Sequence, residues 1–265
     1  MLSFLQSETE PSPRVVIVSP HPDDEIIGAG SRLPLLRECV VAQVTDGSPP
    51  DPGDAESAGF ASTEEYARAR HRELRAALAL TGHREVLELG FPDQRASFHL
   101  AELTVRLREL FLQLQPAFVL TVPYEGGHPD HDATAFGVQA ACRSLESWQR
   151  PAVIEMLSYH NANGSCAMGE FLDEDQKQVL TIQLGTENQA FKRKLFDCFA
   201  SQQRVLRWFQ TSVEKFRIAP TYNFLEPPHD GTLYYEMFPW GMTGESWRRL
   251  AAEALRELME QHSHA

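Results

Sequence analysis

The stretch VVIVSPHPDDE, residues 15–25, joins a run of β-branched residues to a turn rich in His, Pro and Asp. Consecutive Val and Ile residues are typical of a strand that is buried on both faces, as in the middle of a parallel sheet. The strand should end at Ser19-Pro20, and a helical pattern follows over residues 24–37. Because open parallel sheets bind ligands at the carboxyl ends of their strands, the turn lies where a functional site is expected.

Strands and helices alternate from this stretch through residue 148. The residue patterns predict further strands over 40–45, 86–89 and 117–122, helices over 63–80, 97–115 and 132–145, and a long loop over 46–62. Such alternation builds right-handed βαβ units, which form a parallel sheet covered by helices on both faces. We therefore expect an α/β fold that is Rossmann-like, with a mostly parallel sheet.

The C-terminal part of the chain has a less regular pattern. It predicts strands over 152–158, 179–184 and 233–236, helices over 187–209 and from residue 245, and loops over 161–176 and 220–232. The aromatic residues Trp208, Phe209 and Phe216 are interpreted as core residues rather than as a platform for a sugar. Residues 1–13 are polar and contain prolines, which predicts a flexible lead-in, and residues 14–265 are interpreted as a single domain.

Composition argues against several classes of protein. The 265 residues carry a formal charge of −13, which disfavours nucleic acid or an anionic membrane surface as the main partner. The four cysteines are far apart, so neither a disulfide scaffold nor a cysteine zinc site is expected. Residues 1–14 show no secretory signal, and no apolar stretch approaches the length of a membrane span. The sequence predicts a soluble, cytoplasmic protein and leaves open whether it forms a homo-oligomer.

Two turns of similar sequence follow two of the predicted strands. The first is His21-Pro22-Asp23-Asp24, and the second is His128-Pro129-Asp130-His131. Either turn alone could be a helix N-cap with a surface histidine, because aspartate caps are common. Two such turns at equivalent strand ends are better explained by a shared site at one edge of the sheet. Histidine and carboxylate side chains gathered there predict a bound divalent metal ion.

The chemistry of a hydrolytic metal site assigns a role to each of these side chains. A catalytic zinc usually takes three protein ligands, and His21, Asp24 and His131 would supply them, for Zn²⁺ or for another divalent ion. The ion would bring the pKa of a bound water toward about 7. Asp23 is then a candidate general base. His128 could protonate the leaving group or stabilise the oxyanion, with Asp130 orienting it through its other ring nitrogen.

At these residues the sequence resembles the LmbE-like, or PIG-L, family of zinc-dependent N-acetylglucosamine deacetylases. The resemblance spans about residues 15–205 and is carried by the two His-Pro-Asp turns. Weaker agreement is found in three further places: residues 70–73, residues 91–93, and Lys192 together with Ser201-Gln202. The resemblance implies a Rossmann-like fold and the same metal ligands, base and acid as assigned above.

The resemblance also implies that Arg70 and Asp93 contact the substrate. Each residue has another interpretation from the sequence alone. Arg70 could form an i, i+3 surface pair with Glu73, and Asp93, which follows a proline, could simply form a turn. Some family members carry a catalytic tyrosine just before the second turn, where this chain has Gly126-Gly127, and Tyr124 is out of register with it.

The function implied is hydrolysis of an N-acetyl, or other N-acyl, group on a small amino sugar or glucosaminide conjugate. One alternative is an amidase that acts on a non-acetyl amide. Another is an inactive protein that only binds a metal ion or a sugar, although an intact base beside a complete ligand set disfavours it. The loops over 46–62, 161–176 and 220–232 show no family pattern, so the exact substrate stays open.

Overall fold

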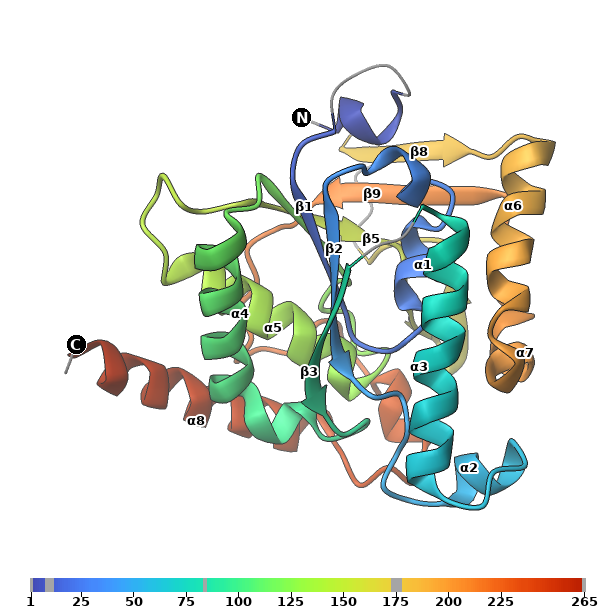
Figure 1. Cartoon of the computed structure of the whole chain (residues 1–265). Coiled ribbons are helices and arrows are strands. Elements are labelled where there is room, and N and C mark those ends of the chain that lie inside the picture. Colours follow the sequence, from blue (N-terminus) through green and yellow to red (C-terminus); the bar gives the residue numbers. More distant parts are fainter. Residues whose placement is uncertain (1, 8–11, 83–84, 173–177, 264–265) are drawn as a thin grey trace.

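The computed structural model describes residues 2–7, 12–82, 85–172 and 178–263 (Figure 1). Its main feature is a seven-stranded sheet in which the first five strands are parallel and the last two are antiparallel additions at one edge. In spatial order the strands are β3 (Glu85–Phe91), β2 (Cys39–Thr45), β1 (Val15–Ser19), β4 (Phe118–Thr121), β5 (Ala152–Met156), β9 (Val213–Ile218) and β8 (Val179–Gln183). The predicted α/β class with a mostly parallel sheet is confirmed.

Helices cover both faces of the sheet (Figure 1). One face carries α1 (Asp24–Ala29), α3 (Thr63–Leu80) and α6 (Thr186–Asp197), and the other carries α4 (Leu100–Leu114), α5 (Pro129–Arg143) and α8 (Gly244–Ser263). The residues of β1 alternate between the two cores. Val15 and Ile17 pack on the α1 side, and Val16 and Val18 pack on the α4 side. The unbroken β-branched run therefore belongs to a strand buried on both faces.

The helix after β1 is shorter than predicted. It ends at Ala29, and residues 33–35 form only a single 3-10 turn, η2. Pro34 explains the break, because proline lacks the amide hydrogen that a continuing helix needs and disfavours a helical residue before it. The predicted loop over 46–62 contains one short helix, α2 (Gly53–Ser57).

The C-terminal part differs most from the prediction. At the start of the predicted loop over 161–176, β6 (Tyr159–Ala162) and β7 (Ser165–Met168) form a hairpin whose turn is Asn163-Gly164, both with positive φ. Such a pair is typical of a two-residue hairpin turn. The predicted helix over 187–209 breaks after Asp197 into the short elements η4 (Ala200–Gln202) and α7 (Gln203–Leu206), and the predicted strand over 233–236 is instead the 3-10 turn η5 (Tyr234–Met237).

The prediction of a flexible lead-in is wrong for its first residues. Ser3–Leu5 form a 3-10 turn, η1, and the side chains of Phe4 and Leu5 are buried in the core on the α1 side. The Phe4 ring lies 4.6 Å from that of Phe118, so apolar contacts hold this segment against the sheet. Residues 1 and 8–11 lie outside the described residues. Within the described chain, no helix is both long and apolar enough to span a bilayer.

Candidate active site

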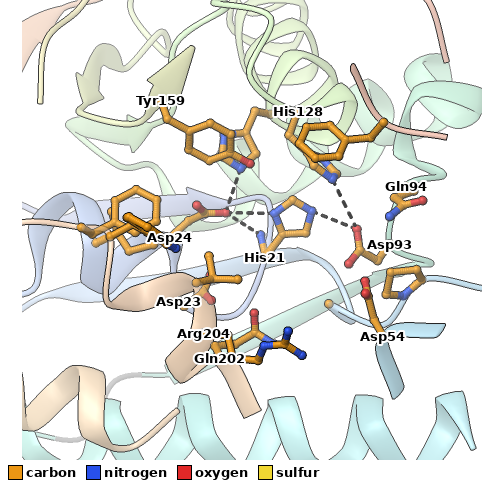
Figure 2. Close-up of a pocket in the computed structure, with 18 of the residues that line it drawn as sticks. His21, Asp23, Asp24, Asp54, Asp93, Gln94, His128, Tyr159, Gln202 and Arg204 are labelled. Carbon is orange, nitrogen blue, oxygen red and sulfur yellow. Dashed lines mark hydrogen bonds and ion pairs between the residues drawn. The ribbon is translucent and has the colours of Figure 1, made fainter. Parts of the chain in front are cut away.

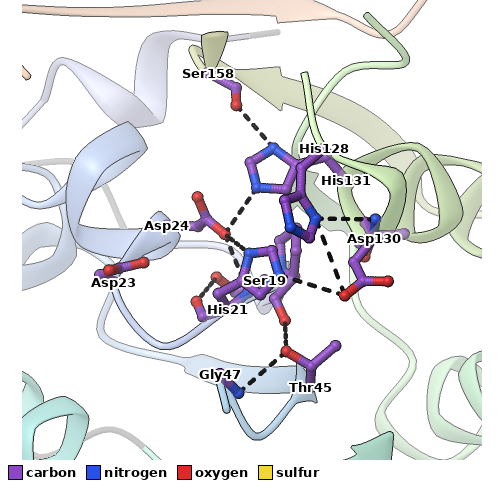
Figure 3. A network of polar contacts seen from close by, with 12 residues as sticks. Ser19, His21, Asp23, Asp24, Thr45, Gly47, His128, Asp130, His131 and Ser158 are labelled. Carbon is purple, nitrogen blue, oxygen red and sulfur yellow. Dashed lines mark hydrogen bonds and ion pairs between the residues drawn. The ribbon is translucent and has the colours of Figure 1, made fainter. Parts of the chain in front are cut away.

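The two His-Pro-Asp turns meet at the carboxyl edge of the parallel strands, as expected. His21 lies in the turn after β1 and Asp24 is the first residue of α1, whereas His128 precedes α5 and His131 lies in its first turn, after β4 (Figure 3). His128 is the N-cap of α5, and its Nδ1 accepts a hydrogen bond of 3.1 Å from the amide of Asp130. Proline at the first helical position suits this start, because its fixed φ matches a helix and no amide hydrogen is lost.

Three of these side chains surround one point (Figure 3). Oδ2 of Asp24 lies 3.1 Å from Nδ1 of His21 and 3.2 Å from Nε2 of His131. Nε2 of His131 is buried and has no hydrogen-bond partner among the described residues, while its Nδ1 lies 2.9 Å from Oγ of Ser158. Two ligands of a tetrahedral zinc ion lie about 3.3 Å apart. The spacing and the orphaned nitrogen therefore fit a small divalent ion.

A second group of side chains faces Nε2 of His21, the ring nitrogen that points away from Asp24. Nε2 of His21 lies 3.1 Å from Oδ1 of Asp93 and 3.5 Å from Oδ2 of Asp130. With His128, these residues form an overlapping group that could also hold a metal ion. Both oxygens of Asp130, however, already accept backbone hydrogen bonds, from the amides of Gln94 and Ala96.

The position of Asp130 corrects one prediction. Its carboxylate lies 4.0 Å from the ring of His128 and forms no hydrogen bond with it, so the amide of Asp130, and not its carboxylate, contacts Nδ1 of His128. Because that Nδ1 accepts a hydrogen bond, a neutral His128 carries its proton on Nε2. Burial, together with the charge on His21, holds the pKa of His128 well below its ordinary value, so the neutral form dominates.

Asp23 has an unusual backbone conformation. Its φ of 142° lies in a region that non-glycine residues rarely adopt and that costs about 1–3 kcal/mol. Neighbouring contacts hold the turn in place: the amide of Asp23 donates to the Glu25 carboxylate, which also accepts a hydrogen bond from Ser19. Strained residues of this kind cluster at functional sites.

Arg70 lies beside Asp23 rather than on the surface. Its side chain is only 4% exposed, and Nη1 donates to Oδ2 of Asp23 over 3.3 Å. The alternative of a surface pair with Glu73 is therefore wrong, because Glu73 instead accepts two hydrogen bonds from Ser201. Burial raises the pKa of Asp23 to about 7, although the charge on Arg70 acts in the opposite direction. A carboxyl that titrates near neutrality suits proton transfer.

The ligand group lies at the bottom of a cavity of about 370 Å³. Figure 2 shows Gln202 and Asp54 on one side of this cavity and Tyr159 on the other, with His21 and Asp24 between them. The lining also includes several aromatic residues, among them Phe209, Tyr234, Phe238, Trp240 and the exposed Trp208. The interpretation as a core residue is therefore wrong for Trp208. Phe209 is half-buried and packs against the core while also lining the cavity, and Phe216 is fully buried in the core.

Several residues that contact the candidate site were not found from the sequence. Ser158 touches the candidate ligand His131, and Tyr159 packs its ring 5.2 Å from that of His131, yet both residues lie in a segment without a recognisable motif. Trp240, 4.8 Å from the ring of His128, lies more than a hundred residues further along the chain. No local pattern in this part of the chain indicates a contact with the second His-Pro-Asp turn.

Comparisons with known proteins agree with this arrangement. A family model described as "PIG-L: GlcNAc-PI de-N-acetylase" matches residues 16–142. A relative named probable N-acetyl-alpha-D-glucosaminyl L-malate deacetylase 2, from Bacillus cereus, is 29% identical over 143 residues, which cover 52% of this chain and 65% of the relative. The chain thus spans slightly less than two thirds of that relative's length. The protein of the same name from Bacillus subtilis is 25% identical over 219 residues, covering 75% of this chain and 95% of the relative.

A solved structure gives the same picture of the fold. The N,N'-diacetylchitobiose deacetylase from Pyrococcus horikoshii superposes with a TM-score of 0.57 at 19% identity, over 82% of this chain and 87% of that protein. At this identity the likeness concerns the fold alone, and the activity must be argued from the side chains of the site.

Proposed function

The chain carries a PIG-L (LmbE-like) family domain over residues 16–142, and from this premise we propose that the protein is a metal-dependent hydrolase that removes the N-acetyl group from an amino sugar or a glucosaminide conjugate. The observation that carries the proposal is the meeting of both turns around Oδ2 of Asp24, with Asp23 and His128 beside them. We propose that residues 14–265 act as one domain in this reaction. The cytoplasmic location and the oligomeric state stay predictions.

We assign the metal to His21, Asp24 and His131, and we propose that it is zinc. The overlapping group around Asp93 is the weaker choice, because both oxygens of Asp130 already accept hydrogen bonds. Asp93 instead lies where an outer carboxylate would orient a metal-bound histidine through its free nitrogen, and Ser158 holds the corresponding position on His131. When bound, a zinc ion polarises the amide carbonyl and lowers the pKa of a water molecule.

The remaining side chains move the protons. Asp23 accepts a proton from the attacking water, whose oxygen forms a bond with the amide carbon. The carbon–nitrogen bond then breaks, and Asp23 passes the proton that it took from the water to the departing amine. The neutral His128 donates a hydrogen bond from Nε2 to the oxyanion that forms on the way. Arg70 holds the Asp23 carboxylate in place through its hydrogen bond. Products are the carboxylic acid and the free amino sugar.

The names of the relatives support an N-acetylglucosamine-containing substrate, because one refers to a malate conjugate and another to diacetylchitobiose. An amidase that acts on a non-acetyl amide is the second candidate, since the same groups would hydrolyse either bond. A panel of N-acylglucosamine derivatives, assayed for the free amine after metal loading, separates the two. Release of amine only from derivatives with longer acyl groups would favour the amidase.

The role of Asp23 gives the sharper test. Asp23→Asn keeps all three ligands, so we expect unchanged metal content and a kcat that falls roughly 10²- to 10⁴-fold. Asp51→Asn is a matched control, because Asp51 is exposed and outside the cavity lining. A kcat equal to that of the wild type in Asp23→Asn would show that another group accepts the proton.

A further inference from the structure

One side of the cavity is formed by a continuous series of aromatic rings. We call Phe209, Tyr159, Tyr234, Phe238 and Trp240 the aromatic wall. Successive ring centroids along it are 6.0, 5.8, 5.1 and 4.6 Å apart, and the last two rings are stacked. All five side chains line the same cavity.

The aromatic wall reaches the reacting groups at two points. The ring of Trp240 lies 4.8 Å from that of His128, and the ring of Tyr159 lies 5.2 Å from that of His131. From there the wall extends outward to Phe238, which is 36% exposed. A substrate whose amide is held at the metal ligands therefore has apolar surface beside it from the bottom of the cavity to its mouth.

Further apolar side chains are exposed at this mouth. Val205 and Trp208, which lie in and just after α7, are 49% and 65% exposed and line the cavity together with Phe238. Single exposed apolar residues are common on protein surfaces, but a group of them around one opening marks a binding surface. Aromatic rings at such a surface bury a large apolar area at a small cost in conformational entropy.

The opposite side of the cavity is polar. Asp54 and Gln202 line it, and Asp93 and Gln94 lie between it and His128, so that polar groups can hydrogen-bond sugar hydroxyl groups. The carboxylates of Asp54 and Asp93 disfavour an anionic substituent beside them, and the buried cation Arg70 of the same lining already pairs with Asp23. Arg204 also lines the cavity and is exposed, so a carboxylate near the mouth remains the main competing ligand chemistry and must be part of any test.

We propose that the aromatic wall and the mouth residues Val205 and Trp208 bind an apolar aglycone, an alkyl or aryl group on the anomeric carbon of the amino sugar. The inference rests on the proposed deacetylation. If the bond broken is that of an acetyl group, the acyl part ends next to the buried ligands, and only the sugar substituent extends to the mouth. The substrate class is then an N-acetylglucosaminide with an apolar substituent, rather than a free or an acidic sugar.

Calorimetry on metal-loaded Asp23→Asn protein tests the binding without turnover. The probes are N-acetylglucosamine, its octyl glycosides in both anomeric forms below the micelle concentration, and its carboxymethyl glycosides. We expect one octyl anomer to bind at least tenfold more tightly than the free sugar. The affinity for the carboxymethyl glycosides should exceed that for the free sugar by less than threefold. Octyl affinity within twofold of the free sugar, or tighter binding of the carboxymethyl compounds, would overturn the proposal.

A second variant tests the residues. Trp208→Ala, added to Asp23→Asn, should reduce the preference for the octyl glycoside at least threefold. The substitution removes the apolar contact of an exposed ring and does not disturb the core. Trp148→Ala is the matched control, since Trp148 is 77% exposed and is not among the cavity-lining residues. An equal loss in both variants, or no loss in Trp208→Ala, would contradict the assignment.

Two further measurements separate the alternatives. Sedimentation with phosphatidylcholine vesicles should leave the protein in the supernatant, and co-sedimentation would show that the mouth binds a lipid surface rather than a single aglycone. Acetate release by the wild type is measured separately on the same glycosides. Binding preference without any acetate release would contradict the proposed deacetylation but support the apolar site, whereas release without preference would contradict only the apolar site.

Discussion

Replacing Lys192 by methionine removes a charge that is almost completely buried. The ammonium group of Lys192, 1% exposed, donates to Oε1 of Glu214 over 2.9 Å and to the carbonyl of Ile27 in α1 over 2.7 Å. Glu214 is equally buried. Lys192→Met therefore leaves a buried carboxylate without its closest cation and a helix carbonyl without its donor.

The expected cost follows from these contacts. Removal of one partner of a buried ion pair costs about 3–5 kcal/mol, because the other charge stays buried. Nε of Arg32 lies 3.7 Å from Oε2 of Glu214, and Ser31 donates two hydrogen bonds to the same carboxylate. In Lys192→Met these contacts still stabilise part of the buried negative charge of Glu214. We therefore expect the lower end of the range, about 3 kcal/mol.

Urea denaturation followed by far-UV circular dichroism measures this loss. With an m-value of about 3 kcal/mol/M, the midpoint should fall by about 1 M. Lys194→Met, an exposed lysine of the same helix, is the matched control and should change stability by no more than about 0.5 kcal/mol. Glu214→Gln combined with Lys192→Met should lose less than the sum of the two single variants. A loss below about 1 kcal/mol in Lys192→Met alone would refute the reasoning.

Three other substitutions test the site and its supports. His131→Ala should lower the metal content measured by elemental analysis, and an unchanged stoichiometry would exclude His131 as a ligand. Ser158→Ala should weaken metal affinity about 10- to 100-fold in a competition with a chelator, because the outer partner of a ligand histidine is lost. Gly127→Ala would bring a Cβ into collision with the carbonyl oxygen of Tyr159, so thermal unfolding should show a loss of about 1–3 kcal/mol. In Gly185→Ala the added Cβ would meet none of the described atoms within 4 Å, so no clash is expected, and the cost should stay below about 1 kcal/mol, which reflects only the preference of the α6 N-cap for glycine over alanine.

The parallel half of the fold could be predicted because its local patterns agree with its burial. The β-branched run of β1 is buried on both faces, and the predicted helix over 63–80 has the observed bounds of α3. Ser62 caps that helix by accepting a hydrogen bond from the amide of Glu65, which is the contact that a capped start implies. The meeting of both His-Pro-Asp turns followed from the strand ends alone.

Strand β9 was missed for a physical reason. Its buried positions include Glu214 and Arg217, which hide the alternation of apolar and polar residues that a strand normally shows. Each is buried because it is paired, Glu214 with Lys192 and Arg217 with Glu155 over 2.7 Å. Those partners are distant in sequence, so no local pattern reveals them.

The site residues that sequence reasoning misjudged depend on tertiary contacts in the same way. Arg70 is buried only because α3 packs beside the turn that holds Asp23. Asp130 uses its carboxylate to hold the loop after β3, a contact that its position beside His128 does not suggest. The Asn163-Gly164 turn is different, because that dipeptide is a known hairpin signal and could have been read from the sequence.

Along the chain, the residues proposed to carry out the reaction are separate from those proposed to select the substrate. The proposed metal ligands, base and acid all lie between residues 21 and 131, inside the segment that matches the family. Every ring of the aromatic wall comes from residues 159–240, beyond that segment. Mutations in the later part can therefore change the preferred substrate while the earlier part preserves the reaction, so new specificities can evolve, or be engineered, by exchanging the C-terminal segment between relatives.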